Sequence, residues 1–182
     1  NCQLREGDEL EKNADYSECR FFPVQQHFGR PDLEEFVREI FPEGLTPHGK
    51  RYLLDECLVI QGTKGSDPFV PLEPTIELVV ELVRRLEFPN QLSRMEAMFG
   101  WASKAEAERF REDFHQGQGN IIVLEAELAG IFDIQQLFLG GTTIGSWLFA
   151  RRYWTGVPSP APRWELLLRP PVVVHQILTN PG

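Results

Sequence analysis

The residues of this chain best suited to chemistry are an arginine and a glutamate, each beside an apolar segment. Ser93-Arg94 precedes a segment that ends in Phe99-Gly100-Trp101, and Glu165 lies in an apolar run just before Pro170-Pro171. Forked guanidinium donors suit a phosphate, and a carboxylate can stabilise a developing positive charge. The chain contains no phosphate-binding loop, dinucleotide-binding glycine fingerprint, nucleophile elbow, HExxH or paired CxxC. Arg94 and Glu165 are therefore the candidates to follow.

The possible metal ligands do not form a recognisable set. The histidines and cysteines share no ligand spacing, and the cysteines are odd in number; they are His27, His48, His115, His175, Cys2, Cys19 and Cys57. Such a pattern is typical of ordinary surface or core histidines and of reduced, incidental thiols in a cytosolic protein. Metal catalysis is disfavoured.

Each candidate also has an ordinary structural interpretation. Arg94 could form a surface ion pair with Glu87 or Glu96. Glu165 alternates with its apolar neighbours, as a solvated glutamate on a half-exposed sheet also does. Tyr153 and Trp154 end an expected helix, where aromatic residues usually serve packing.

The first half of the chain is predicted to be helical. Residues 1–30 form a polar, irregular entry segment with one short strand at Arg20–Gln25, and residues 31–87 are mainly helical. Pro31 suits a first helical position, and Thr46-Pro47 begins a second helix. The stripe Ile76–Val83 predicts a third.

The third expected helix is apolar on two sides. Val79, Val80 and Val83 form one face, and Leu78 and Leu82 make the opposite side apolar as well. A helix of this kind is expected to be packed inside the domain.

Residues 88–182 are predicted to be rich in strands. The expected strands are Met95–Trp101, Ile121–Glu127, Ile131–Leu139, Trp164–Leu168 and Val172–Ile177, the last two separated by Pro170-Pro171. A capping box at Ser103–Glu106 begins a helix that turns Ala107, Phe110 and Phe114 inward, and Gly140-Gly141-Thr142 caps another that runs to about Trp154. Helices come early and strands late, so the expected class is α+β.

Length and charge limit the functions to consider. The chain has 182 residues, which suits one domain, and 18 basic against 27 acidic residues give a net charge of −9. An acidic protein is unsuited to an extended nucleic-acid surface. No apolar run is long enough to cross a bilayer. The unpaired cysteines lead us to expect a cytoplasmic protein. The chain begins at Asn1 rather than methionine, which suggests a trimmed or excised domain.

The order of these elements resembles the ADP-ribosyltransferase fold, in which a split sheet clamps NAD. In that fold a glutamate followed by apolar residues and a proline pair marks the catalytic strand. The resemblance covers Glu77 to Leu178. Within it, Phe88-Pro89, Ser93-Arg94, Phe99, Tyr153-Trp154-Thr155-Gly156 and Trp164-Glu165 also resemble an uncharacterised bacterial family with this expected fold.

The resemblance implies a helical N-terminal half packed on a split, mostly antiparallel sheet, with NAD as substrate. Breaking the nicotinamide–ribose bond develops positive charge on the ribose, which the Glu165 carboxylate would stabilise. Arg94, with Ser93, would bind the pyrophosphate, and Phe99, Tyr153 and Trp154 would flank the nicotinamide. The implied activity is transfer of ADP-ribose to an unknown acceptor macromolecule, or to water.

Three departures from the family pattern keep an alternative open. Arg163 stands where arginine-modifying transferases carry a second acid, a Ser-Thr-Ser strand motif is missing, and His27 fits poorly as a first-strand histidine. The alternative is a non-catalytic interaction module, including an acidic antitoxin or immunity-type partner. It would use exposed aromatic residues such as Trp147, Trp154 and Trp164.

One geometric feature separates the two interpretations. The enzyme requires Arg94 and Glu165 to converge on one concave pocket, whereas an interaction module would place its aromatic side chains on a flat or convex patch.

Overall fold

A computed structural model describes residues 4–21, 28–55 and 72–178. Cys2, His27 and Cys57 lie outside these ranges, as does most of the strand expected at Arg20–Gln25. Among the described residues, no helix has both the length and the apolar character that a membrane crossing needs.

The described helices follow the expected order along the chain. They are α1 (Arg30–Ile40), α2 (Pro47–Lys50) with a π-helical turn at Arg51–Asp55, α3 (Leu72–Glu87), α4 (Lys104–His115) and α5 (Thr143–Trp154). The expected caps are present: the side chains of Thr46, Ser103 and Thr142 accept hydrogen bonds from the first-turn amides of α2, α4 and α5. Local sequence signals therefore set the helix starts correctly.

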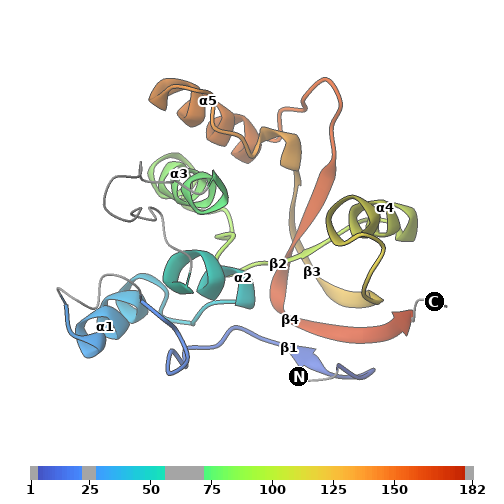
Figure 1. Ribbon diagram of the computed structural model, residues 1–182, viewed down its shortest axis with the longest axis horizontal. Helices are drawn as coiled ribbons and strands as arrows, with labels where there is room; N and C mark the ends of the chain where they lie inside the picture. Colours follow the sequence, from blue (N-terminus) through green and yellow to red (C-terminus); the bar gives the residue numbers. More distant parts are fainter. Residues whose placement is uncertain (1–3, 22–27, 56–71, 179–182) are drawn as a thin grey trace, which may run out of the picture.

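The described strands form one antiparallel sheet built around its last strand. The strands are β1 (Glu9–Leu10), β2 (Met98–Gly100), β3 (Ile121–Asp133) and β4 (Trp164–Leu178). β3 pairs with β4 along its length, from Ile121 opposite Leu178 to Asp133 opposite Trp164. On the other side, β2 pairs with the first half of β4 and β1 with the second half (Figure 1). This split sheet with its mostly N-terminal helices confirms the α+β class.

Three of the expected strands have different bounds. β2 covers only Met98–Gly100, and β3 runs on to Asp133, so the separate strand expected at Ile131–Leu139 is wrong. The chain leaves the sheet there because the Asp133 carboxylate accepts a hydrogen bond from Gln135 N, 3.0 Å away, and a 3₁₀ turn follows.

The two strands expected around the proline pair are one continuous strand. The ladder between β3 and β4 passes from Glu127 opposite Arg169 to Glu125 opposite Val173, with a shift of register between them. Pro170 and Pro171 lie within that shift, so neither has to donate a hydrogen bond to β3. A proline pair therefore does not end this strand.

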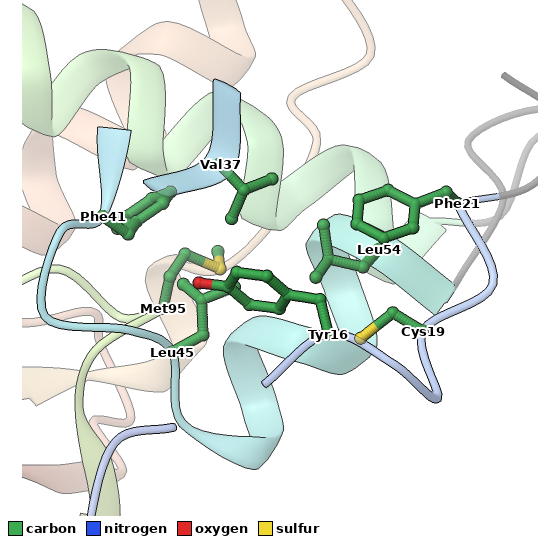
Figure 2. Close-up of a cluster of buried hydrophobic side chains, with 8 residues drawn as sticks. All are labelled: Tyr16, Cys19, Phe21, Val37, Phe41, Leu45, Leu54 and Met95. Atoms are coloured by element: carbon green, nitrogen blue, oxygen red, sulfur yellow. The ribbon is translucent and has the colours of Figure 1, made fainter. Parts of the chain in front are cut away.

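The buried apolar side chains form two clusters. The first lies among the N-terminal helices and consists of Tyr16, Cys19, Phe21, Val37, Phe41, Leu45, Leu54 and Met95 (Figure 2). Burial raises the pKa of the free Cys19 thiol, as expected for a packing residue.

The second cluster lies between α3, α5 and the sheet, where the two helices lie side by side (Figure 1). It consists of Val80, Val83, Ala97, Phe132, Ala150, Tyr153, Trp154 and Leu167. The segment from Met95 to Ala97 contributes one residue to each cluster, so the residues just before β2 tie the helical part to the sheet.

Two expectations about buried helix faces hold only in part: Val80 and Val83 of α3 are buried and Ala107 and Phe110 of α4 are half-buried, but other residues of those faces are not. On α3, Leu82 is 50% exposed and Leu78 is also exposed, whereas Glu77, Glu81 and Arg84 are buried beside the valines. On α4, Phe114 is 59% exposed and no residue is fully buried. Hydrophobic periodicity misses both cases because α3 buries ion-paired charges and α4 covers its sheet face loosely.

Candidate functional site

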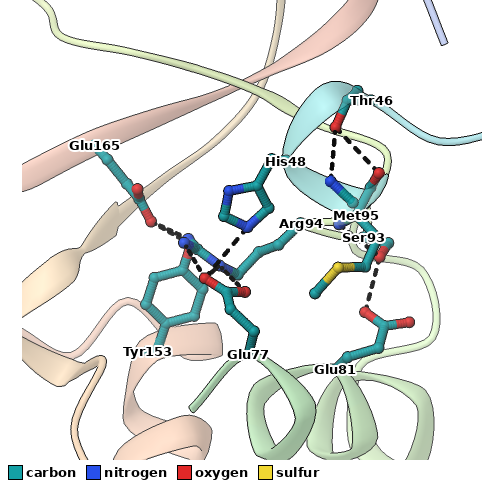
Figure 3. A network of polar contacts seen from close by, with 10 residues as sticks. Thr46, His48, Glu77, Glu81, Ser93, Arg94, Met95, Tyr153 and Glu165 are labelled. Carbon is teal, nitrogen blue, oxygen red and sulfur yellow. Dashed lines mark hydrogen bonds and ion pairs between the residues drawn. The ribbon is translucent and has the colours of Figure 1, made fainter. Parts of the chain in front are cut away.

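The two candidate ionic residues meet in the interior, although they are 71 positions apart in the sequence. Arg94 comes from the loop between α3 and β2, and Glu165 is the second residue of β4. Tyr153, near the end of α5, joins them, and Glu77 of α3 completes the group (Figure 3). We call these four residues the buried tetrad.

The loop before β2 fixes Arg94 from both sides. Ser93 Oγ donates to Glu81 Oε2, 2.8 Å away, and the Met95 carbonyl accepts from the hydroxyl and the amide of Thr46, each at 3.1 Å. Helix α2 approaches this loop so closely that a Cβ on Gly49 would lie 2.2 Å from Met95 O. Glycine is therefore required at position 49, and Arg94 has little freedom to shift.

Both edges of the Arg94 guanidinium are occupied. Nε and Nη2 donate to the two oxygens of Glu77, each at 2.9 Å, and Nη1 donates to Glu165 Oε1 and to the Tyr153 hydroxyl. The Tyr153 hydroxyl in turn donates to Glu165 Oε1 at 2.7 Å. Among the described residues, the hydrogen bonds that Glu165 accepts from Arg94 and Tyr153 both go to Oε1, which leaves Oε2 outside this group of contacts.

Burial makes these charges strongly dependent on one another. Arg94 is 4% exposed and Glu165 is 6% exposed. Burial alone would lower the pKa of Arg94, but Glu165 and Glu77 outweigh it, and the pKa lies well above the usual value. Burial would likewise raise the pKa of Glu77, yet Arg94, together with the neighbouring His48, holds it at about 2. Arg94 and Glu77 are thus a charged pair at neutral pH.

Tyr153 is the neutral member of the tetrad. Burial, together with the negative charge of Glu165, raises its pKa well above the usual value, against the opposing effect of Arg94. Its hydroxyl therefore keeps its proton and orients one oxygen of Glu165. Two interpretations considered from the sequence are therefore wrong. Arg94 does not form a surface ion pair with Glu87 or Glu96, and Glu165 is not a solvated residue.

The remaining sequence candidates occupy different places. Phe99 lies beside the tetrad, with its ring centroid 4.7 Å from the Arg94 guanidinium carbon. Ser93 precedes Arg94 in the chain, but its hydroxyl belongs to a neighbouring network and donates to Glu81, which also pairs with Arg84. Trp154 is buried in the second core cluster, where its indole donates to Val80 O at 2.9 Å, so it is not an exposed docking aromatic.

Sequence reasoning missed Glu77 and His48. His48 Nε2 lies 3.3 Å from Glu77 Oε1 without the alignment of a hydrogen bond, and the His48 ring is 4.6 Å from that of Phe99. Glu77 and Glu81 stand four residues apart in the apolar stretch Ile76–Val83 of α3, and that spacing was a usable signal. His48 lies on a four-residue helix and had none.

An open space in the described part of the structure lies on the other face of the sheet. A hollow of about 780 Å³ is lined by α4, β2, β3 and β4, and neither Arg94 nor Glu165 lines it. Side chains alternate along β4. Leu166 and Leu168 face the hollow, whereas Leu167 lies in the core cluster between α3 and α5, and Glu165 faces the same side as Leu167. Arg94 and Glu165 meet, but neither lines this hollow, so the concave pocket that the enzymatic interpretation requires is not shown.

The described residues offer no obvious metal site, because no three of their histidine, cysteine, aspartate and glutamate side chains gather with suitable geometry. The tetrad contains a buried guanidinium that would oppose a cation. Its chemistry is that of an oriented carboxylate beside an arginine and a neutral phenol.

Residues 63–180 match the profile of the family described as "Protein of unknown function (DUF2441)", which is well over half of the chain. The chain belongs to this family. The matched region contains all four residues of the buried tetrad, while His48 precedes it. A comparison with curated proteins finds no significant match. The family carries no stated activity, so the function has to be argued from the site.

Proposed function

We propose that this protein cleaves the nicotinamide–ribose bond of NAD and transfers ADP-ribose to an acceptor macromolecule or to water, with an ADP-ribosyltransferase-like core. The observation that supports this most is the meeting of Arg94, Tyr153 and Glu165, three residues from separate elements. They hold one oxygen of the glutamate and leave the other outside this group of contacts. Perturbed, buried ionisable groups of this kind cluster at functional sites.

Glu165 is the proposed catalytic residue. The bond from ribose C1′ to the nicotinamide nitrogen breaks, and its electron pair leaves with the nicotinamide. Positive charge then builds on the ribose, where a fixed carboxylate gives more stabilisation in the transition state than in the ground state. A lone pair of the acceptor forms the new bond at C1′, and the acceptor releases a proton. Tyr153 and Arg94 orient the carboxylate through its Oε1.

Arg94 also has the donors that a pyrophosphate needs, but Glu77 occupies them in this structure. A phosphate can take the same Nε and Nη2 edge, because its oxygens have the spacing of a carboxylate. We therefore propose that the pyrophosphate of NAD replaces Glu77 on Arg94, with Phe99 and Tyr153 beside the nicotinamide. Trp154 is left out of this arrangement because its indole donates to Val80 O rather than to Glu165.

The test measures nicotinamide release from NAD by the purified protein, with Glu165→Gln as the active-site variant and Glu127→Gln as the control. Glu127 is an exposed glutamate on β3 that pairs with Arg169 at 3.0 Å. Loss of Glu165 is expected to slow release by about 100-fold or more, the usual effect of removing an electrostatic stabiliser. Glu127→Gln is expected to retain the full rate.

The proposal fails if the wild-type protein releases no nicotinamide and saturating NAD leaves its melting temperature unchanged. A ligand at 100 times its dissociation constant should stabilise the protein by about 2.7 kcal/mol. Equal rates for Glu165→Gln and wild type would remove Glu165 from the catalytic role.

A second candidate is a non-catalytic interaction module, including an acidic antitoxin or immunity-type partner. It is favoured by the saturation of Arg94 and by the position of the hollow on the other face. The tetrad would then serve folding alone. This alternative predicts no NAD turnover and a binding surface that includes exposed aromatic residues such as Trp147. For both candidates we propose a cytoplasmic location, in keeping with the free, buried Cys19.

A further inference from the structure

Helix α4 covers its face of the sheet loosely. None of its residues is fully buried, and the sheet residues beneath it include Leu128, which is 50% exposed. Between helix and sheet lies the hollow of about 780 Å³, a volume in the range of small-molecule pockets. We call it the α4 groove. An apolar sheet face that its own helix leaves open is suited to an added apolar ligand.

The lining of the α4 groove is apolar and carries only positive charge. Its aliphatic floor comes from β3 and β4, and Trp101 and Phe110 form an aromatic wall with ring centroids 4.8 Å apart. Lys104, Arg111 and His115 line it, but no aspartate or glutamate does. In a protein with 27 acidic and 18 basic residues, this is a local reversal of charge.

Arg111 has donor capacity left for an anion. Its Nη1 donates to Gly119 O at 3.2 Å, and its Nε is buried without a hydrogen-bond partner among the described residues. Lys104 differs, because Glu108 pairs with it at 3.4 Å on the outer surface. Arg111 lines the groove and has no ion-pair partner among the described residues, so the anionic end of a ligand belongs near its guanidinium.

We infer that the α4 groove binds a long-chain monocarboxylate of the fatty-acid class. The floor from Ile121 to Leu128 extends about 23 Å at roughly 3.3 Å per residue, which suits an extended chain. The aliphatic chain would lie on Leu124, Leu166 and Leu168, and the carboxylate would accept from Arg111. This inference does not depend on NAD chemistry, because Glu165 lies on the opposite face.

The experiment titrates the full chain with monomeric dodecanoate by calorimetry and maps the site by amide chemical shifts. Arg111→Gln is compared with Arg109→Gln, which removes the same charge from the same helix at an exposed position outside the groove. Arg111→Gln is expected to weaken binding by about tenfold, the effect of one lost charge-assisted hydrogen bond. Arg109→Gln is expected to bind like wild type.

A second variant fills the groove. Ala126→Trp places a large side chain on its floor and is expected to abolish dodecanoate binding, with an unchanged circular dichroism spectrum as the check on folding. For wild type, the amide shifts are expected in α4 and the first half of β3.

Several results would overturn the inference. These are no dodecanoate binding up to about 1 mM, equal losses in the two arginine variants, or amide shifts that leave α4 and the first half of β3 unaffected. Binding only to phosphatidylglycerol vesicles, or displacement of dodecanoate by NAD, would also overturn it. Nicotinamide release does not enter this test, so its outcome is separate from that of the proposed NAD chemistry.

Discussion

The two faces of the sheet differ in what covers them. On one face, α3 and α5 cover the buried tetrad, so that its charged groups are shielded from solvent and hydrogen-bond to one another. On the other face, α4 leaves an open, apolar groove lined by cations. The residues best suited to chemistry therefore lie on the closed face, while the free volume lies on the open face. In this protein the clustered ionic residues and the open pocket are therefore two separate candidate sites.

The largest effect is expected when the tetrad loses its cation. Arg94→Leu leaves Glu77 and Glu165 buried without their ion-pair partner, which should cost about 3–5 kcal/mol of unfolding free energy. Urea unfolding followed by circular dichroism measures the cost. Arg109→Leu on the open side is the control and should change stability by less than about 0.5 kcal/mol. Equally small losses of stability in Arg94→Leu and Arg109→Leu would mean that the tetrad is exposed to solvent.

A pH titration of stability tests the same face. The folded pKa of Glu77 is about 2, below its usual 4.5, so its contribution is complete above pH 4.5 and is lost as the pH falls towards 2. The depression corresponds to about 3 kcal/mol. Wild type should lose stability steeply over this window, and Glu77→Gln should show a shallower decline. Parallel curves for the two proteins would contradict the assignment.

The start of β4 depends on a single buried carboxylate. Asp133 accepts from Ser159 N at 2.7 Å and from Arg163 N at 2.8 Å, and so holds the loop that leads to Glu165. Asp133→Asn replaces a charged acceptor and should cost about 2 kcal/mol in thermal or urea unfolding. A loss below about 0.5 kcal/mol would show that the loop is held by other contacts.

The smallest effect is expected on the open face. Ser103 caps α4 by accepting from Glu106 N at 3.3 Å, and Ser103→Ala should destabilise the helix by about 1 kcal/mol. Because α4 contributes no fully buried residue, the loss should appear as faster amide exchange in α4 with little change in global stability. A full loss of about 1 kcal/mol in global unfolding would mean that α4 belongs to the cooperative core.

The sequence predicted local features better than it predicted their surroundings. The starts of α2, α4 and α5 followed from Thr46, Ser103 and Thr142, because a cap is a contact between near neighbours. The α+β class followed from the order of periodic segments. The unbroken β4 did not follow, since the register shift that accommodates the proline pair depends on β3.

The candidate site was also predicted only in part. Arg94 and Glu165 were chosen through their places in a pattern that resembles the ADP-ribosyltransferase fold, and the structure brings them together with Tyr153. Glu77 was overlooked because a buried charge interrupts an apolar pattern without altering its period. The sequence also could not predict which face of the sheet is open, because that depends on how α3, α4 and α5 pack against it.

The most direct test of the proposed function is to locate NAD on the protein by amide chemical shifts. The account predicts shifts in the loop around Arg94 and at the start of β4, with α4 and the first half of β3 unaffected. It also predicts that Glu77→Gln, which removes the charge that competes for Arg94, binds NAD more tightly than wild type. Shifts confined to α4 and β3, or no shifts at saturating NAD, would contradict the assignment of the buried tetrad as the NAD site.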